Sequence, residues 1–219
     1  MKRLTDIQRT ALWASVAVAT VAVAALVWWL TKRRSDRTLT GHGDGGNLIT
    51  GAVQAVVDKA KEITGMKYFT ISELTRSSTA QSRGIDNTPP PAVRAKLETL
   101  ITECLDPIRR IYGRPIVVSS GYRSPALNAA VGGVANSQHT TGEAADLVPA
   151  SGGSLAGIFR AAVQWGGYDQ LIIERSGNSK WVHVSYGPRH RRKILAYNKG
   201  RYTDITSNWE NYLNSNNIA

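Results

Sequence analysis

The sequence has a single cysteine, which excludes an intrachain disulfide. Cys104 lies within an apolar stripe at helical spacing that runs from Val93 to Ile111, so the pattern predicts a core residue and not a thiol nucleophile. Internal repeats are lacking, and no helix-turn-helix, zinc-finger or aromatic RNA-binding signature accompanies the basic cluster at residues 188–193. We therefore do not expect nucleic acid as a partner. The net charge of +11 favours other anionic surfaces, such as bacterial cell walls and membrane phospholipids.

Charge is also absent from residues 11–30, an apolar run flanked by lysine and arginine and carrying tryptophans near both ends. Its length matches the hydrocarbon thickness of a bilayer, and tryptophan suits the interfaces, so it predicts a transmembrane anchor after a short basic segment at 1–10. A cleaved signal peptide is the alternative, but no small-residue cleavage site follows the run. Residues 31–47 are rich in glycine and basic residues and predict a flexible linker. Residues 48–65 predict an amphipathic helix that docks on the domain or on the membrane surface.

Histidine is scarce, with four in the chain, and two of them fall in segments that otherwise predict buried strands. A catalytic zinc ion usually takes three protein ligands from His and Asp or Glu and leaves one position for water. His139 and Asp146 lie seven residues apart around Gly142, where a tight turn can bring a loop and a strand together. With His183 downstream they make a candidate site for one zinc ion. The alternative for His183 alone is a core histidine with its hydrogen bonds satisfied.

A family resemblance rests on these same residues. The motif Ser-x-His-x-x-Gly-x-Ala-x-Asp at residues 137–146, with Ser-Gly-Tyr-Arg-Ser before it and Val-His-Val-Ser after it, resembles the M15 zinc peptidases of D-alanyl-D-alanine carboxypeptidase and endolysin type. The resemblance runs from about Tyr68 to about Leu195. It is closest to the C-terminal-like subgroup of M15 subfamily A, found in phage and bacterial cell-wall enzymes, whose domains open with a stretch like residues 68–74 here.

The resemblance implies roles for individual residues. His139, Asp146 and His183 match the zinc ligands of the family. Arg123 matches an arginine that contacts substrate and stabilises the charge on the attacked carbonyl, and Ser137 of the same motif is expected beside it at the substrate. A structural turn arginine is the alternative for Arg123.

The catalytic base departs from the family pattern. Many M15 members place an Asp or Glu three residues before the last histidine ligand, where this chain has Lys180, which cannot take a proton while charged. The β-prone runs at 171–175 and 180–185 are joined by a turn-forming segment and predict a hairpin. A turn centred at 177–178 puts Glu174 diagonal to His183, and one centred at 178–179 puts it directly opposite. Glu174 is therefore the expected base, with Asp169 as second candidate; a pair with a surface arginine is the alternative for Glu174.

The domain expected over residues 66–195 is of the α+β class. Start and stop residues predict helices over 93–111, 125–131 and 155–163, and a strand over 115–119 delivers Arg123 from the turn after it. The resemblance implies a hedgehog/DD-peptidase-like zinc fold, with a small antiparallel sheet flanked by helices. Residues 196–219 are expected to form a polar C-terminal tail.

These patterns predict a membrane-anchored zinc metallopeptidase that hydrolyses peptide bonds in peptidoglycan stem peptides, as a carboxypeptidase or as an endopeptidase, in cell-wall degradation, host lysis or phage entry. Because that substrate lies outside the cytoplasmic membrane, the N-terminus is expected in the cytoplasm and the catalytic domain on the extracytoplasmic side, at a host inner membrane or a virion membrane. The alternative is an inactive wall-binding or virion structural protein that retains the zinc fold, for which Lys180 is the supporting feature.

Overall fold

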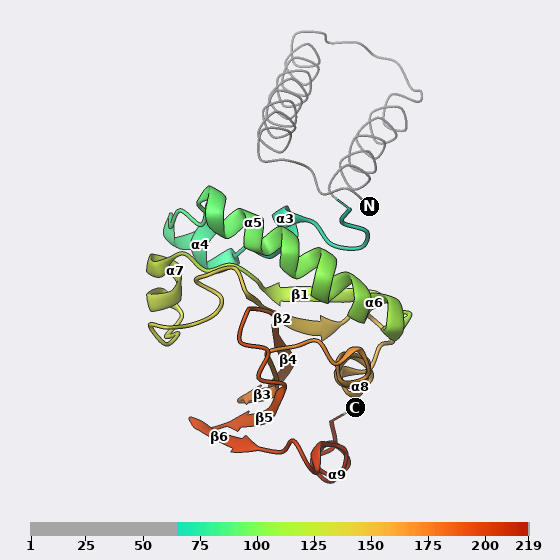
Figure 1. The fold of residues 1–219 in the computed structure, drawn as a ribbon. Helices are drawn as coiled ribbons and strands as arrows, with labels where there is room; N and C mark the ends of the chain where they lie inside the picture. The colour runs from blue at the N-terminus through green and yellow to red at the C-terminus, as the bar shows by residue number, and fades with distance from the viewer. Residues whose placement is uncertain (1–64, 219) are drawn as a thin grey trace, which may run out of the picture. The chain divides into compact units, whose positions relative to one another are not determined.

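The computed structural model describes residues 65–218 (Figure 1). The predicted anchor at 11–30, the linker at 31–47 and all but the last residue of the predicted helix at 48–65 lie outside the described residues. Within the part that is described, no helix is both long enough and apolar enough to cross a bilayer.

Six strands form one sheet in the order β1-β2-β4-β3-β5-β6. Their bounds are Ile116–Ser120, Ala144–Pro149, Gln170–Ser176, Ser179–Ser185, Lys193–Asn198 and Arg201–Asp204 for β1 to β6. Neighbours are antiparallel except β3 and β5, which are parallel, so the prediction of an antiparallel sheet is wrong for this pair. The loop after β4 causes the difference, because it passes the start of β3 and lets β5 begin beside Gln170. Asp169 holds that loop through the backbone of Lys193 and the side chain of Arg191.

The predicted long helix over 93–111 is present in three joined parts. They are α5 (Pro91–Leu100), a π-helical turn (Ile101–Leu105) and α6 (Asp106–Tyr112). The remaining helices of residues 65–218 are α3 (Ile71–Thr75), α4 (Ser78–Arg83), α7 (Pro125–Ala130), α8 (Leu155–Trp165) and α9 (Trp209–Ser215). Gly113 and Gly166 end α6 and α8 in the left-handed conformation, as the predicted helix stops require.

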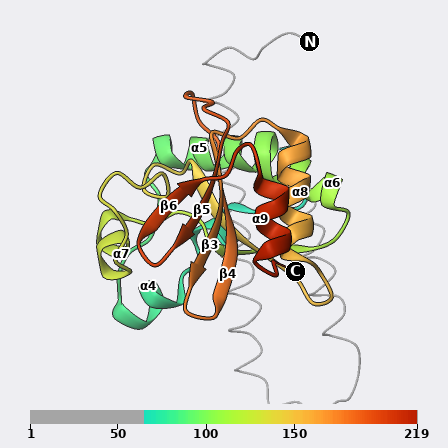
Figure 2. The ribbon, with the colours of Figure 1, turned by 90° about the horizontal axis from the view of Figure 1, so that it is seen from below.

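The two faces of the sheet have different roles. Alternate residues of β3 and β4, such as Leu171, Ile173, Val182 and Val184, are buried in the hydrophobic core on one face. Helices α8 and α9 lie on that side of the strands, and α4 and α7 lie on the other (Figure 2). The intervening residues of the same strands point to the face toward α4 and α7, where a cleft opens.

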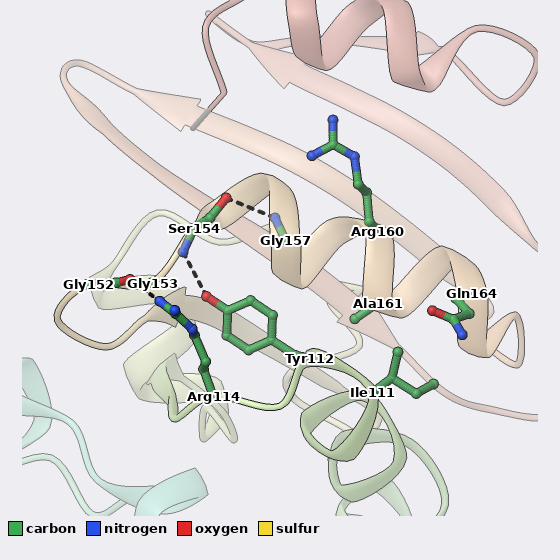
Figure 3. A pocket seen from close by; sticks show the side chains of 10 residues that line it. All are labelled: Ile111, Tyr112, Arg114, Gly152, Gly153, Ser154, Gly157, Arg160, Ala161 and Gln164. Atoms are coloured by element: carbon green, nitrogen blue, oxygen red, sulfur yellow. Dashed lines mark hydrogen bonds between the residues drawn. The ribbon is translucent and has the colours of Figure 1, made fainter.

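The contact of α6 with the start of α8 is a structural junction (Figure 3). The Tyr112 hydroxyl accepts a hydrogen bond from the Ser154 backbone N–H at 2.7 Å, and the Ser154 hydroxyl caps α8 by accepting from Gly157 at 3.0 Å. A Cβ at Gly157 would lie 2.7 Å from the Tyr112 ring, so the close approach needs glycine there. The cavity beside this junction shares no lining residue with the cleft on the sheet.

The segment expected to be a polar tail is folded instead. It completes β5, adds β6 and ends in α9, and Ile205, Leu213 and Ile218 are buried in the common core. Trp209 packs on Phe159 of α8 with ring centroids 6.0 Å apart. A few well-placed apolar side chains are enough to fix the segment, because each buries its surface against a core that the rest of the domain has already built.

Candidate metal centre

Three side chains that the sequence singled out converge at the floor of the cleft. His139 comes from the loop before β2, Asp146 from β2 and His183 from β4, and all three are buried. The register of the sheet explains the meeting, because Asp146 and His183 are directly opposite each other on neighbouring strands. One ligand atom of each residue lies within 4.8 Å of the other two.

The spacing of these atoms fits a tetrahedral ion. His139 Nε2 lies 3.2 Å from His183 Nδ1 and 3.3 Å from Asp146 Oδ1, and His183 Nδ1 lies 3.0 Å from Asp146 Oδ1. Zinc bonds of about 2.0–2.1 Å at a tetrahedral angle separate ligand atoms by about 3.3 Å. Two nitrogens and one carboxylate oxygen are also a donor set that zinc prefers. The three residues therefore fit one zinc ion and leave a side open to the cleft.

The backbone around Gly121 sets the orientation of His139. The Nδ1–H group of His139 donates to the Gly121 carbonyl at 2.7 Å, which leaves the Nε2 lone pair facing Asp146 and His183. A Cβ at Gly121 would lie 2.2 Å from the Leu74 carbonyl oxygen, so glycine is required for this close approach. The expected turn after His139 is also present, with Gly142 at a φ of +74°.

Arg123 holds the second oxygen of the Asp146 carboxylate. Its Nη2 lies 2.7 Å from Asp146 Oδ2, and its Nε donates to the Ser120 hydroxyl at 2.8 Å. Burial alone would raise the pKa of Asp146, but the His139 and His183 imidazoles lower it well below its ordinary range. The carboxylate is therefore charged and fixed, ready to act as a ligand. Ser120, which sequence reasoning missed, gave no signal beyond its place in the Ser-Gly-Tyr-Arg motif.

Glu174 lies on the same face of the sheet as His183. The turn centres on Gly177 and Asn178, so Ile172 is opposite His183 and Glu174 is diagonal to it, as the first predicted register requires. Glu174 lines the cleft, and burial raises its pKa above the ordinary value. Among the described residues no ion pair joins it to an arginine, and its carboxyl faces the same cleft as the metal cluster.

Lys180, at the family's usual base position, and Asp169, the second candidate for the base, are both engaged elsewhere. Lys180 and His183 lie three positions apart on β4, so their side chains are on opposite faces of the sheet. The Lys180 Nζ donates to the Asn217 carbonyl at 3.0 Å, outside the cleft. Asp169 is fully buried and accepts from Arg191 Nε at 2.8 Å, Arg191 Nη2 at 2.6 Å and Gln138 Nε2 at 3.0 Å. The Arg191 guanidinium is the main reason why the pKa of Asp169 falls to about 2. Asp169 therefore ties the His139 loop to the loop after β4 and has no free position for water.

The cleft above the cluster has a volume of about 900 Å³. Ser137 lines it, and its hydroxyl accepts from the His139 backbone N–H at 3.4 Å, so the residue shapes the ligand loop as well as facing the cleft. Sequence reasoning also missed much of the cleft wall, including Gln138, Trp181, Tyr197 and Tyr202. Alternation with Glu174 and His183 along the strands would have placed Trp181 on this face.

Comparison with known proteins places the chain in a family. A family model described as peptidase M15 matches residues 67–185, more than half of the chain. The chain belongs to the peptidase M15 family. It is also 36% identical over 121 residues to a protein named zinc D-Ala-D-Ala carboxypeptidase from Streptomyces albus G. The aligned region is 54% of this chain and 46% of that relative, so the match spans about half the length of the curated protein.

Family membership confirms the predicted M15 resemblance, and the clustered His139, Asp146 and His183 agree with a zinc-peptidase family. All three cluster residues lie inside the matched range. Strands β5 and β6 and helix α9 lie beyond its end at residue 185 and are additional to it.

Proposed function

We propose that this M15 protein is a zinc-dependent peptidase that hydrolyses peptide bonds in the stem peptides of peptidoglycan. The observation that carries the proposal is the convergence of His139 Nε2, Asp146 Oδ1 and His183 Nδ1 at spacings of 3.0–3.3 Å beneath an open cleft. Family membership and the name of the Streptomyces relative support the same chemistry and the same class of substrate.

Each residue of the site has a part in the reaction. His139, Asp146 and His183 would hold a zinc ion, which would lower the pKa of a bound water and polarise the scissile carbonyl. Glu174 takes the proton from the attacking water and passes it to the leaving amine, and its raised pKa brings it nearer the value that suits a base at neutral pH. Asp146 stays ionised as a ligand because the His139 and His183 imidazoles lower its pKa, and Arg123 fixes its other oxygen in place.

Arg123 also carries positive charge to the wall of the cleft. Its side chain is partly exposed there while it pairs with Asp146. We propose that its guanidinium helps to stabilise the negative charge that develops on the attacked carbonyl oxygen. Ser137 lines the same cleft, on the loop whose His139 carbonyl accepts from the Arg123 backbone N–H, and is proposed to contact the substrate peptide.

We also propose that residues 11–30 anchor the enzyme in a membrane, with the N-terminus in the cytoplasm and the catalytic domain outside. The uncharged run with tryptophans near both ends supports the anchor, and the location of peptidoglycan supports the orientation. A role in host lysis or phage entry would follow from release of such an anchored enzyme to the wall. Cysteine-scanning with a membrane-impermeant thiol reagent, in a Cys104→Ser background, would test the orientation.

The experiment for the enzymatic proposal is mass spectrometry of muropeptides after incubation of the zinc-loaded full-length protein with purified peptidoglycan. The His139→Ala protein is the matched control. New cleavage products with the wild type alone would support the proposal and name the bond that is cut. A folded, zinc-bound protein that releases nothing from several wall types would instead favour a wall-binding or virion structural protein.

A further inference from the structure

Four side chains form a row across the cleft face of the sheet. Trp181 on β4 is directly opposite Glu174 on β3, Glu174 is in register with Tyr197 on β5, and Tyr197 is opposite Tyr202 on β6. All four line the cleft that contains the metal cluster. The proposed base therefore has an indole on one side and two phenol rings on the other.

The two tyrosines form an aromatic surface in which Tyr202 is exposed and Tyr197 is half-buried. Their ring centroids are 4.7 Å apart, and Tyr202 is 55% exposed although it is one of the largest apolar side chains of the domain. A partly exposed aromatic pair at the edge of a polar cleft is typical of a ligand-binding surface, because an uncovered ring offers an apolar face to a ligand. Both residues lie beyond residue 185, so the surface is an addition to the part of the chain that matches the family.

We propose that Tyr197 and Tyr202 form a subsite for a sugar ring of the glycan to which the stem peptide is attached. This inference rests on the proposed function and makes its substrate more specific: a peptide still joined to its saccharide. The C–H face of a pyranose ring is apolar and packs on an aromatic ring, and the ring hydroxyls can bond the phenol oxygens at the edge.

The distances on the sheet agree with such a substrate. Neighbouring strands are about 4.8 Å apart, so Tyr202 on β6 lies two strands, or about 10 Å, from Glu174 on β3. An extended chain advances about 3.4 Å per residue. A sugar on the tyrosine pair and a scissile bond beside Glu174 are therefore separated by about three residues, the length of a short stem peptide.

The test compares two substrates that carry the same stem peptide, one free and one joined to its disaccharide. For the full-length zinc-loaded protein, we expect Tyr202→Ala to lower the ratio of kcat/KM for the disaccharide-peptide to that for the free peptide by about fivefold to tenfold. Tyr202→Phe keeps the ring and loses only the hydroxyl, so it should lower the ratio less than Tyr202→Ala does. Arg201→Ala is the matched control, since Arg201 alternates with Tyr202 along β6 and does not line the cleft.

A binding measurement separates this inference from the proposed function. Titration of the Glu174→Gln protein with an N-acetylglucosamine tetramer, followed by calorimetry, needs no hydrolysis. Weaker binding on adding Tyr202→Ala, with Arg201→Ala unchanged, supports the subsite even if no peptide is cleaved. If Tyr202→Ala has the same ratio of kcat/KM as the wild type, and the tetramer does not bind, the subsite is overturned. Any observed peptidase activity would still stand.

Discussion

Glu174 lies diagonal to His183 on the neighbouring strand, on the face of the sheet that carries the metal cluster. This relationship follows from a two-residue turn at Gly177 and Asn178, and a turn one residue later would have put the carboxylate directly opposite His183. A carboxylate in this position is within the same cleft as the ligands without being one of them. The absence of an acidic residue at position 180 is therefore compatible with a complete set of catalytic groups.

Lys180→Met should leave catalysis intact. Lys180 donates to the Asn217 carbonyl outside the cleft, so the substitution removes one hydrogen bond near the C-terminus at a cost of about 1 kcal/mol in the free energy of unfolding. We expect kcat/KM on stem peptides within twofold of wild type and a small decrease in melting temperature. A tenfold loss of kcat/KM with unchanged zinc content would show that Lys180 acts at the site after all.

Zinc should stabilise the wild type by binding the folded state alone. At a free concentration a thousandfold above Kd the gain is about 4 kcal/mol, and chelation should remove it. Calorimetry with and without chelator should show this difference for wild type and none for His183→Ala. His190→Ala is the matched control, because His190 is exposed and outside the cluster. Equal responses of the two histidine variants to chelator would contradict the assigned ligands.

Asp169→Asn should make the free energy of unfolding less dependent on pH between pH 4 and pH 2. The pKa of Asp169 falls from 3.8 to about 2 in the folded protein, so its charged form adds stability above pH 4 that is lost as the pH falls toward 2. The variant should be less stable than wild type at pH 7 by on the order of 2 kcal/mol, and this difference in the free energy of unfolding should disappear between pH 4 and pH 2. Urea unfolding of both proteins without metal would measure the difference. A gap of the same size at pH 2.5 and pH 7 is the outcome that this account does not allow.

Leu213→Ala tests whether the C-terminal segment is part of the folded domain. Leu213 is 1% exposed in the core, and truncation of such a leucine costs about 2–5 kcal/mol. Asn211→Ala, at an exposed position of the same helix, should change the free energy of unfolding by less than about 0.5 kcal/mol. Urea denaturation of the two variants would give the comparison. Indistinguishable midpoints would mean that α9 is not docked on the core.

The turn into β2, the β3–β4 hairpin and the long helix could be predicted because their signals are local, whereas the meeting of Asp146 with His183 across 37 residues was expected from the family resemblance. The spacing of His139, Gly142 and Asp146 specifies a turn into a strand, and the hairpin turn fixes Glu174 relative to His183. The structure confirms both. The helices that end at Gly113 and Gly166 were recognisable for the same reason, since a left-handed glycine ends each one.

Other features depend on contacts between distant segments. The parallel pairing of β5 with β3 requires Asp169 and Arg191 to meet across 22 residues, which no local pattern reports. Helix α9 is fixed by a few apolar residues in a polar segment, so its periodicity is weak. A local signal for α3 was overlooked: Thr70 and Glu73 form a capping box that identifies the start of this short helix. The membrane anchor remains a prediction from sequence.

The most direct test of the account is the rate of stem-peptide hydrolysis by Glu174→Gln at zinc content equal to wild type. Glutamine keeps the shape of the side chain but cannot take the proton, so we expect kcat to fall by about 10²–10⁴-fold while the zinc stoichiometry stays at one. Glu103→Gln, an exposed carboxylate on the helical segment away from the cleft, should match wild type. If the zinc-loaded Glu174→Gln protein hydrolyses the peptide at the wild-type rate, Glu174 is not the base and the proposed mechanism is wrong.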